Sequence, residues 1–375
     1  MRIAVVGTSN SIGTGGYVSG MQESGKVHSI ENFSIGHSTS VVLPMIKKKI
    51  DFSSFDFCIF DFVVNEEVQL KNILEISLIN DLLVDFISGM ENTRCIPVIL
   101  IIPSHLGLGE MKPARAFYTD FARRHGVPFF DFYIHLENLA HYSKLSVKSL
   151  FRDPDHLDRW AASAFGFKLA EILASRLSKH VEKIFSEKDG MLFDYMDFSS
   201  LQLGTPTITR ESSVLKVELQ ILRGKQTIQV PIQKGSQIIG IALNLGNTNA
   251  LITLTSGSSR ARYDFGDRYL LVDDERPVFV VRPIVPFRLD ETLQIGIQPP
   301  TKGGDRPPIL EIGGLTIRRS IGKQNELNTN DKDIELALAI SDADVRFAAM
   351  LGNRLSNVRI ALQREMAKNA KQENN

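Results

Sequence analysis

Short apolar runs and longer amphipathic runs alternate along the first half of the chain. The apolar runs predict buried strands, and the longer runs carry apolar residues at helical spacing. The strands are predicted over residues 3–6, 57–64, 97–102 and 127–132, and the helices over residues 38–50, 66–90, 112–125 and 158–181. Strands that alternate with helices are typical of a mainly parallel sheet covered on both faces. The first half is therefore predicted to be an α/β domain.

The pattern changes after Gly190, where strand-like runs become short and follow one another closely. Turns that contain Gly, Asn, Ser and Asp separate these runs, which cover residues 213–222, 226–232, 237–243, 250–255, 269–272, 277–283, 292–297 and 309–318. Regular short strands with such turns favour a β-sandwich. A last run, rich in Ala and Leu and charged on one side, predicts a C-terminal helix over residues 331–368.

This change of pattern predicts three parts: a catalytic domain at 1–185, a β-rich accessory domain at 190–325 and the helical segment at 331–368. The charged stretch 182–190 is the predicted hinge. At 375 residues the chain is long for one domain, and an apolar content of 43% is enough for a core in each half. The alternative is that the later parts complete the core of the first or form the interface of a homo-oligomer.

Charge and cysteine content narrow the class of protein. Lys plus Arg and Asp plus Glu number 43 each, so no nucleic acid partner is indicated. Cys58 and Cys95 lie in or beside apolar runs, which favours buried thiols over a disulfide framework. No apolar run approaches the length of a transmembrane helix, and the first run is too short for the core of a signal peptide. We therefore expect a cytoplasmic protein with no membrane span.

The residues suited to catalysis are concentrated in the first half. All eight histidines, both cysteines and the single tryptophan lie within the first 180 residues. This asymmetry favours chemistry in the first half and a binding or structural role in the second. His135 and His141 lack a companion carboxylate at ligand spacing, so no metal site is predicted. The glycine-rich stretch 13–16 lacks the lysine of a P-loop, so no nucleotide cofactor is predicted either.

Two stretches of the first half carry the residue types of a serine hydrolase. Ser9 follows the first apolar run, where a strand should give way to a loop. The second stretch reads Asp153-Pro154-Asp155-His156. A serine hydrolase needs a base that takes the hydroxyl proton and a carboxylate that orients the base. Asp-x-x-His can supply both from one short turn, and the two stretches could meet at one edge of an α/β sheet.

Four short blocks in the first half resemble the SGNH (GDSL-like) hydrolase family. Residues 6–10 match its nucleophile block around Ser9, with Thr8 where many members carry Asp. Residues 32–38 match the block of its oxyanion glycine, here Gly36. Residues 61–66 match the block of its oxyanion asparagine, here Asn65, although Val63 replaces the usual glycine. Residues 153–156 match its Asp-x-x-His.

The resemblance covers about half the chain and implies a flavodoxin-like, three-layer fold there. It also implies an acyl-enzyme mechanism without a cofactor or a metal. Ser9 would be the nucleophile, His156 the general base and Asp153 the residue that orients it. The oxyanion donors would be the backbone N–H groups of Ser9 and Gly36 and the side-chain amide of Asn65. Loss of one such donor typically costs about 3–4 kcal/mol.

Each of these residues also has a purely structural interpretation. Ser9 and Asn65 could cap helices, Gly36 could serve a turn, and Asp153 could begin one. Ser11 is a competing hydroxyl. The joint occurrence of four blocks in the family's order favours the catalytic interpretation.

Three hypotheses follow for the function. The first is an ester hydrolase that acts on a small-molecule or glycan acyl ester, with carbohydrate O-acetyl groups as one choice. The second is an acyltransferase that uses the same triad on a glycan acceptor. The third is a non-catalytic binding protein on an SGNH scaffold, which the replacement of the family glycine by Val63 keeps open.

Overall fold

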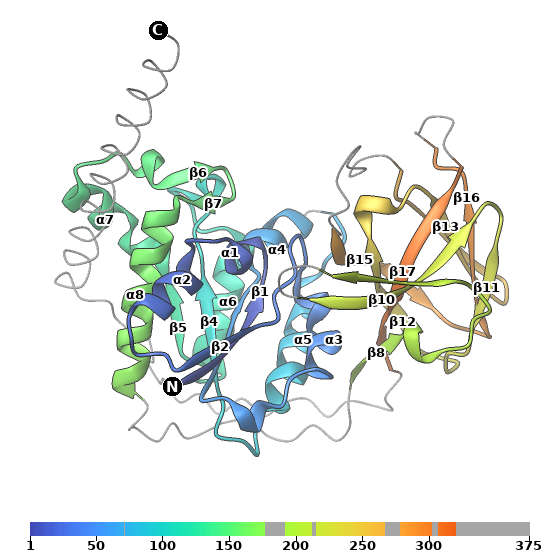
Figure 1. Ribbon diagram of the computed structural model, residues 1–375, viewed down its shortest axis with the longest axis horizontal. Helices are drawn as coiled ribbons and strands as arrows, with labels where there is room; N and C mark the ends of the chain where they lie inside the picture. Colours follow the sequence, from blue (N-terminus) through green and yellow to red (C-terminus); the bar gives the residue numbers. More distant parts are fainter. Residues whose placement is uncertain (71, 177–191, 212–214, 267–277, 302–306, 320–375) are drawn as a thin grey trace, which may run out of the picture.

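The computed structural model describes residues 1–70, 72–176, 192–211, 215–266, 278–301 and 307–319 (Figure 1). An α/β part and a β part lie side by side in it. The predicted strand at 269–272, the predicted hinge at 182–190 and the predicted helix at 331–368 lie outside the described residues.

The first part is built on a parallel five-stranded sheet. The strand order is β2-β1-β3-β4-β5, and every pairing in it is parallel. The strands are β1 (Arg2–Gly7), β2 (Ser29–Asn32), β3 (Phe57–Asp61), β4 (Ile96–Ile101) and β5 (Phe129–Asp131). A small antiparallel hairpin of β6 (Phe151–Asp153) and β7 (His156–Leu157) stands apart from this sheet.

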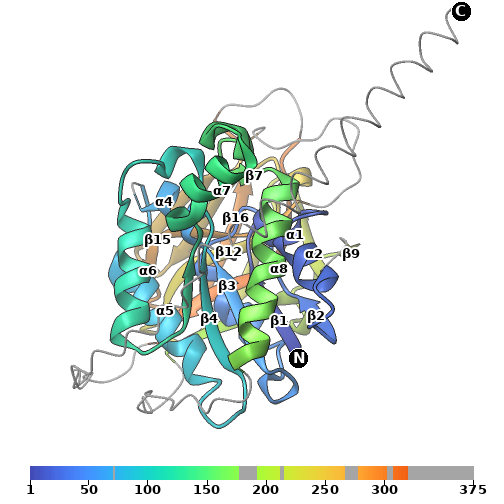
Figure 2. The same ribbon diagram turned by 90° about the vertical axis from the view of Figure 1, so that its left-hand side faces the viewer.

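Helices cover both faces of the sheet (Figure 2). One face packs against α2 (Tyr17–Glu23), α7 (Leu136–Ser143) and α8 (Arg159–Arg176). The other face packs against α3 (Leu43–Lys47), α5 (Ile76–Ser88) and α6 (Pro113–Arg124). Successive residues of a strand point to opposite faces, so Ile3 and Val5 lie in the first core and Ala4 and Val6 in the second. The predicted three-layer α/β fold is confirmed.

The second part consists of antiparallel sheets that enclose a third core, as the sequence predicted. The larger sheet has the order β15-β12-β17-β10-β9, with β8 also paired to β17, and the smaller has the order β11-β16-β13-β14. The strands are β8 (Phe193–Asp197), β9 (Thr207–Glu211), β10 (Lys216–Arg223), β11 (Thr227–Val230), β12 (Gln237–Asn244), β13 (Leu251–Ser256), β14 (Ser259–Asp264), β15 (Phe279–Arg288), β16 (Leu293–Gln298) and β17 (Ile309–Arg318).

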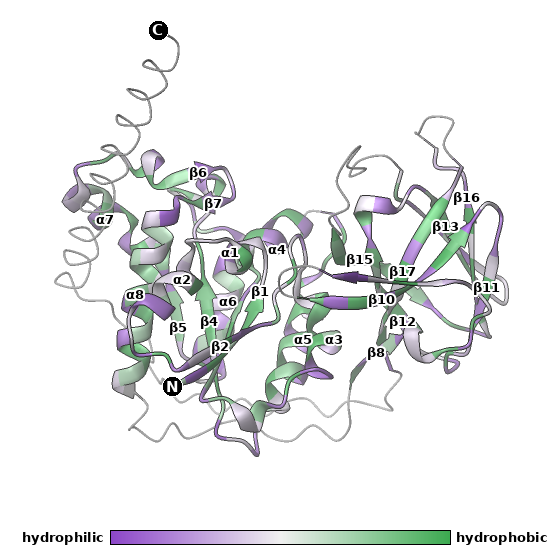
Figure 3. Cartoon of the chain, viewed as in Figure 1, coloured by the Kyte–Doolittle hydropathy of each residue, from purple (hydrophilic) through white to green (hydrophobic). Residues whose placement is uncertain are grey.

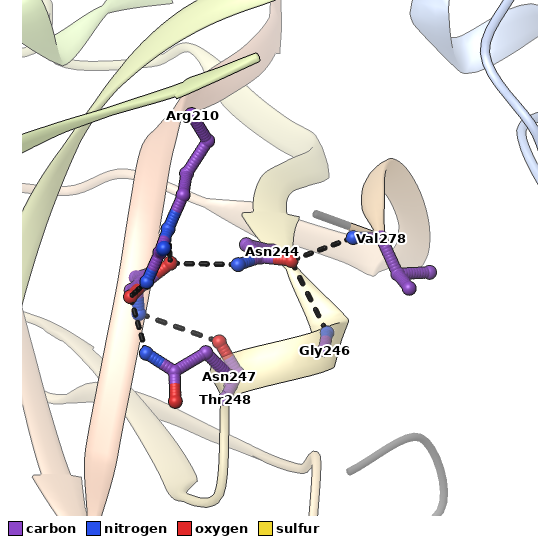
Figure 4. Close-up of polar contacts among 7 residues, drawn as sticks. Arg210, Asn244, Gly246, Asn247, Thr248 and Val278 are labelled. Atoms are coloured by element: carbon purple, nitrogen blue, oxygen red, sulfur yellow. Dashed lines mark hydrogen bonds and ion pairs between the residues drawn. The ribbon is translucent and has the colours of Figure 1, made fainter. Parts of the chain in front are cut away.

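A polar network around Glu311 crosses this second part (Figure 4). The Glu311 side chain is 1% exposed and accepts hydrogen bonds from Arg210, Asn244 and Asn247. Asn244 in turn accepts from the backbone N–H of Val278, at 2.8 Å. Although burial raises the pKa of Glu311, the hydrogen bonds from its three partners lower it below its usual value. The network thereby fixes the end of β12 against the start of β15.

The largest errors of the sequence prediction fall on both sides of β3 and at its end. The predicted strand at 57–64 ends at Asp61, and a helix, α4 (Val63–Gln69), begins two residues later. The predicted helix at 66–90 is two helices, α4 and α5, and the one at 38–50 is a 3-10 turn, η1 (Ser40–Val42), followed by α3. A short apolar run cannot distinguish a buried strand from a buried helix start, which explains the first error.

Several strands were missed because their sequences are polar. Strands β2, β9 and β14 lie at sheet edges, and their sequences SIEN, TITRE and SRARYD contain no apolar run. Figure 3 shows β2 in hydrophilic colours beside its hydrophobic neighbour β1. Among the described residues, no helix combines the length and the hydropathy needed to span a bilayer.

The two parts share one hydrophobic core. The cluster between the sheet and helices α3, α5 and α6 continues into the second part through Leu192, Phe193, Tyr195, Leu219, Ile239, Ala242, Phe279 and Val281. Polar contacts join the same faces: Lys48 donates to the Tyr195 carbonyl at 2.6 Å, and Arg318 pairs with Asp81 at 2.8 Å. The boundaries 1–185 and 190–325 stay predictions. The shared core favours the alternative in which the β part completes the core of the first.

Candidate active site

The β6–β7 hairpin presents Asp153 and His156 to each other. The two residues pair directly across the hairpin, and Asp153 Oδ1 lies 2.6 Å from His156 Nδ1. The side chain of His156 is 20% exposed and that of Asp153 is 43% exposed. Partial burial raises the pKa of Asp153. Hydrogen bonds from His156 and from the Asp155 N–H lower it, as do the charges of His156 and Arg152, and the pKa stays below its usual value. The carboxylate therefore stays ionised beside the imidazole.

The tip of the hairpin is tied to two neighbouring elements. The backbone N–H of His105 donates to the Pro154 carbonyl at 2.8 Å. The Asn10 side chain donates to the Asp155 carbonyl at 3.3 Å. These contacts hold the Asp-x-x-His turn over the end of β1.

Ser9 completes the chain of hydrogen bonds. It opens the short helix α1 (Ser9–Ile12) directly after β1, and its Oγ lies 2.8 Å from His156 Nε2. An N–H in the first turn of a helix has no acceptor within that helix, so the Ser9 N–H can serve an oxyanion. Figure 1 shows α1 and the β6–β7 hairpin at the same edge of the sheet. The structure thus brings together Ser9, His156 and Asp153, the arrangement that activates a serine nucleophile.

Asp61 binds the residues on either side of Ser9, a contact that the sequence analysis missed. Its buried carboxylate accepts hydrogen bonds from the Thr8 N–H at 3.0 Å, the Ser11 hydroxyl at 2.5 Å and the Tyr17 hydroxyl at 3.1 Å. Burial raises the pKa of Asp61 to about 6, although these hydrogen bonds lower it. The competing hydroxyl of Ser11 is therefore buried and bound to Asp61. The one available signal was an aspartate at the end of a buried strand.

Asn65 reaches the loop that carries Gly36. The sequence placed Asn65 at the end of a strand, which is wrong, because it is the third residue of α4. Its Nδ2 donates to the Ser38 carbonyl at 2.8 Å, and the amide carries a second N–H that can face an oxyanion. Val63, which replaces the family glycine, is buried in the core at 5% exposure. Its side chain therefore does not fill the site.

Gly36 lies beside the helix of the nucleophile. The backbone N–H of Ile35 donates to the Gly7 carbonyl at 3.0 Å, and a Cβ on Gly36 would lie 3.9 Å from Ile12 of α1, an ordinary van der Waals contact. The next residue, His37, adopts φ 57°, a left-handed conformation that is uncommon outside glycine. Desolvation and the charge of Arg282 lower the pKa of His37, and so does the nearby His156. Arg282 of β15 thus acts electrostatically on the edge of the site.

The loop from Gly36 to Val41, called the oxyanion loop here, is held by the β part. The Thr316 hydroxyl on β17 donates to the Val41 carbonyl at 3.0 Å, and the Val281 N–H on β15 donates to the Ser38 hydroxyl at 3.4 Å. A Cβ on Gly240 would overlap Val41, so a glycine on β12 permits this close packing. The sequence analysis gave the second half no part in positioning these residues.

Glu66 holds the same loop from the α/β part. Its Oε1 accepts from the Ser40 N–H at 2.8 Å, and the residue has no exposed surface. Burial raises the pKa of Glu66 to about 7, although the hydrogen bonds from Ser40 lower it. The oxyanion loop is therefore fixed between α4 and the β part.

Among the described residues, no group of three or more His, Cys, Asp or Glu side chains is placed to bind a metal.

Comparisons with solved structures identify the fold. The chain is similar to a two-domain esterase (CEX) active on acetylated mannans and co-crystallized with mannopentaose, with a TM-score of 0.63, 11% identity, and coverage of 87% of this chain and 92% of that one. A second structure of a two-domain esterase (CEX) active on acetylated mannans gives a TM-score of 0.62, 11% identity, and coverage of 85% and 91%.

The chain is also similar to a protein of the G-D-S-L family from Desulfitobacterium hafniense DCB-2, at 12% identity. The match covers 47% of this chain and 98% of that one. Its TM-score of 0.37 is too low to support an argument. Neither a protein-family model nor a curated protein matches the sequence.

The likeness to the two-domain esterase extends over both parts of the chain, and at this identity it establishes the fold alone. The protein therefore has the fold of this two-domain esterase, a three-layer α/β part followed by an antiparallel β part. The resemblance predicted from the four sequence blocks is confirmed at the level of fold.

Proposed function

We propose that this protein is a serine-dependent ester hydrolase that removes an acyl group from a carbohydrate. The proposal rests on a continuous chain of two hydrogen bonds. The first joins Ser9 Oγ and His156 Nε2, at 2.8 Å, and the second joins His156 Nδ1 and Asp153 Oδ1, at 2.6 Å. Hydrogen-bond contact between nucleophile, base and orienting carboxylate is the geometric signature of an activated serine.

In the proposed mechanism, Ser9 Oγ attacks the acyl carbon while His156 accepts the hydroxyl proton. Asp153 keeps the imidazole oriented and stabilises its protonated form. The oxyanion is bound by the N–H groups of Ser9 and Gly36 and by the amide of Asn65. His156 then gives the proton to the leaving alcohol, and water attacks the acyl-enzyme in a second cycle of the same steps.

The carbohydrate part of the proposal comes from the protein with the similar fold. The esterase with the similar two-domain fold acts on acetylated mannans. A shared fold does not determine the substrate, but the shared architecture makes acylated glycans the first class of substrate to test.

The experiment measures acetate release from p-nitrophenyl acetate and from acetylated glycans by the wild type and by Ser9→Ala. We expect turnover by the wild type and a loss of several orders of magnitude in kcat for Ser9→Ala, with the fold unchanged by circular dichroism. Full turnover by Ser9→Ala would refute the assignment. A sugar acceptor that intercepts the acetyl group instead of water would favour the acyltransferase alternative.

A further inference from the structure

A cavity lies between the end of α4 and the β part. Its volume is about 610 Å³, and it is lined by Gln69 and Asn72 from the α/β part and by Arg262, Tyr263 and Arg282 from the β part. Pockets that bind small ligands usually lie in the range of about 300–1,000 Å³ and often form where two domains meet. The mechanism above does not use this cavity.

Two segments connect the cavity to the catalytic residues. Gln69 follows Asn65 by one turn of α4, so both lie on the same face, with a rise of about 6 Å between them. On the other side, Arg282 directly follows Val281, whose N–H donates to Ser38 in the oxyanion loop. Figure 1 shows α4 and β15 side by side at this point. The cavity is therefore reached from the oxyanion loop through α4 and β15, and its lining residues are distinct from Ser9, His156 and Asp153.

The lining of the cavity is suited to an anionic, hydroxylated ligand. Two arginines in the lining come from different strands, Arg262 from β14 and Arg282 from β15, and two amide residues, Gln69 and Asn72, come from the α/β part. Guanidinium groups bind carboxylates through paired hydrogen bonds. Among the described residues of the lining, the carboxylate is that of Asp264, which accepts hydrogen bonds from the N–H groups of Gly266 and Thr301.

The strands that carry the two arginines are held in place. The Tyr263 hydroxyl on β14 donates to the Val285 carbonyl on β15 at 3.1 Å, which joins the two sheets at the cavity. The Glu311 network in Figure 4 fixes Val278, next to the start of β15. The strands that carry the two arginines are thus held by the scaffold before a ligand binds.

We propose that this cavity binds a sugar residue with a carboxylate, in the same glycan chain whose ester reaches Ser9. The protein would then act on an acidic acylated glycan, in contrast to a neutral mannan. This inference rests on the proposed function for its link to catalysis, but the binding site itself does not. The positive charge of Arg282 is also felt at His37, where it lowers the pKa of the imidazole.

The test measures binding, which needs no turnover. The full chain is titrated calorimetrically with an oligogalacturonide and with mannopentaose at low and high salt. We expect the wild type to prefer the oligogalacturonide by at least about 10-fold in Kd, and added salt to weaken this preference. Arg262→Gln and Arg282→Gln should each raise the Kd for the oligogalacturonide by about 10-fold or more. Arg260→Gln is the matched control, because Arg260 lies on the same strand but lines a different hollow.

Equal affinity for the two oligosaccharides, or no binding of the oligogalacturonide, would overturn the proposal without any variant. So would Arg262→Gln and Arg282→Gln proteins that bind as tightly as Arg260→Gln. Acetate release from acetylated oligogalacturonides and acetylated mannan separates the two proposals. Tight binding of the acidic ligand without any turnover refutes the proposed function alone, and turnover of mannan without binding of the acidic ligand refutes the cavity assignment alone.

Discussion

Thr316 on β17 gives the sharpest test of how the β part supports the site. Its side chain has no exposed surface, and its hydroxyl donates to the Val41 carbonyl at 3.0 Å. Replacement by valine keeps the shape of the side chain but leaves a carbonyl oxygen of a fully buried residue without this donor. Such an unsatisfied group costs about 1–3 kcal/mol. We therefore expect Thr316→Val to lower the free energy of unfolding by that amount.

The same change should slow catalysis because Val41 ends the oxyanion loop that begins at Gly36. One oxyanion donor is worth about 3–4 kcal/mol, and a loosened loop should lose only part of that. A loss of about 1–2 kcal/mol lowers kcat by about 5- to 30-fold. The assays are urea unfolding and steady-state kinetics on p-nitrophenyl acetate, in which KM should change much less than kcat.

Thr253→Val is the matched control for this prediction. Thr253 is also a buried threonine in a strand, at 6% exposure, but its hydroxyl has no hydrogen-bond partner among the described residues. Its replacement should leave both stability and kcat unchanged or slightly improved. If Thr316→Val and Thr253→Val behaved alike in both assays, the β part would not position the oxyanion loop through this contact.

Three further predictions concern the hairpin, the buried glutamate and the division of the chain. Asp153→Asn should lower kcat by several orders of magnitude, whereas Asp155→Asn, in the same exposed turn, should have little effect; comparable losses in both variants would count against the triad. Burial raises the pKa of Glu66 from 4.5 to about 7, so the folded protein retains a proton that the unfolded chain releases. The free energy of unfolding should therefore fall as pH rises between these values, by up to about 3 kcal/mol, and urea unfolding at several pH values should show a smaller fall in Glu66→Gln. A fragment of residues 1–185 should aggregate in light scattering, because the core that it shares with the β part would be exposed. If the fragment were soluble and still hydrolysed p-nitrophenyl acetate, the first part would fold independently.

The contact between Asp153 and His156 could be predicted from sequence because it depends on local spacing. Asp153 and His156 are close in the chain, and a two-residue turn brings them face to face whatever surrounds it. To place Ser9 beside His156, the prediction also had to assume that the end of the first strand meets this hairpin. The order of the four blocks supported that assumption. The alternation of strands and helices similarly predicted the parallel sheet.

The supports of the oxyanion loop could not be predicted, because they depend on contacts between distant parts of the chain. Val281 and Thr316 contact the loop across 243 and 275 residues, and neither stands in a recognisable motif. Asp61 was hidden for a related reason, since only the folded sheet brings Thr8, Ser11 and Tyr17 around its carboxylate. Asn65 was assigned the right neighbours but the wrong element, because Val63 and Val64 continue an apolar run into a helix.

The central claim is that Ser9 is a nucleophile activated by His156. The most direct measurement is labelling of the native protein with a fluorophosphonate, followed by peptide mapping by mass spectrometry. Our account predicts one adduct, on the peptide that contains Ser9, with no labelling of Ser9→Ala and much slower labelling of His156→Ala. The absence of any adduct on the folded protein, or an adduct on another residue such as Ser11, would contradict it.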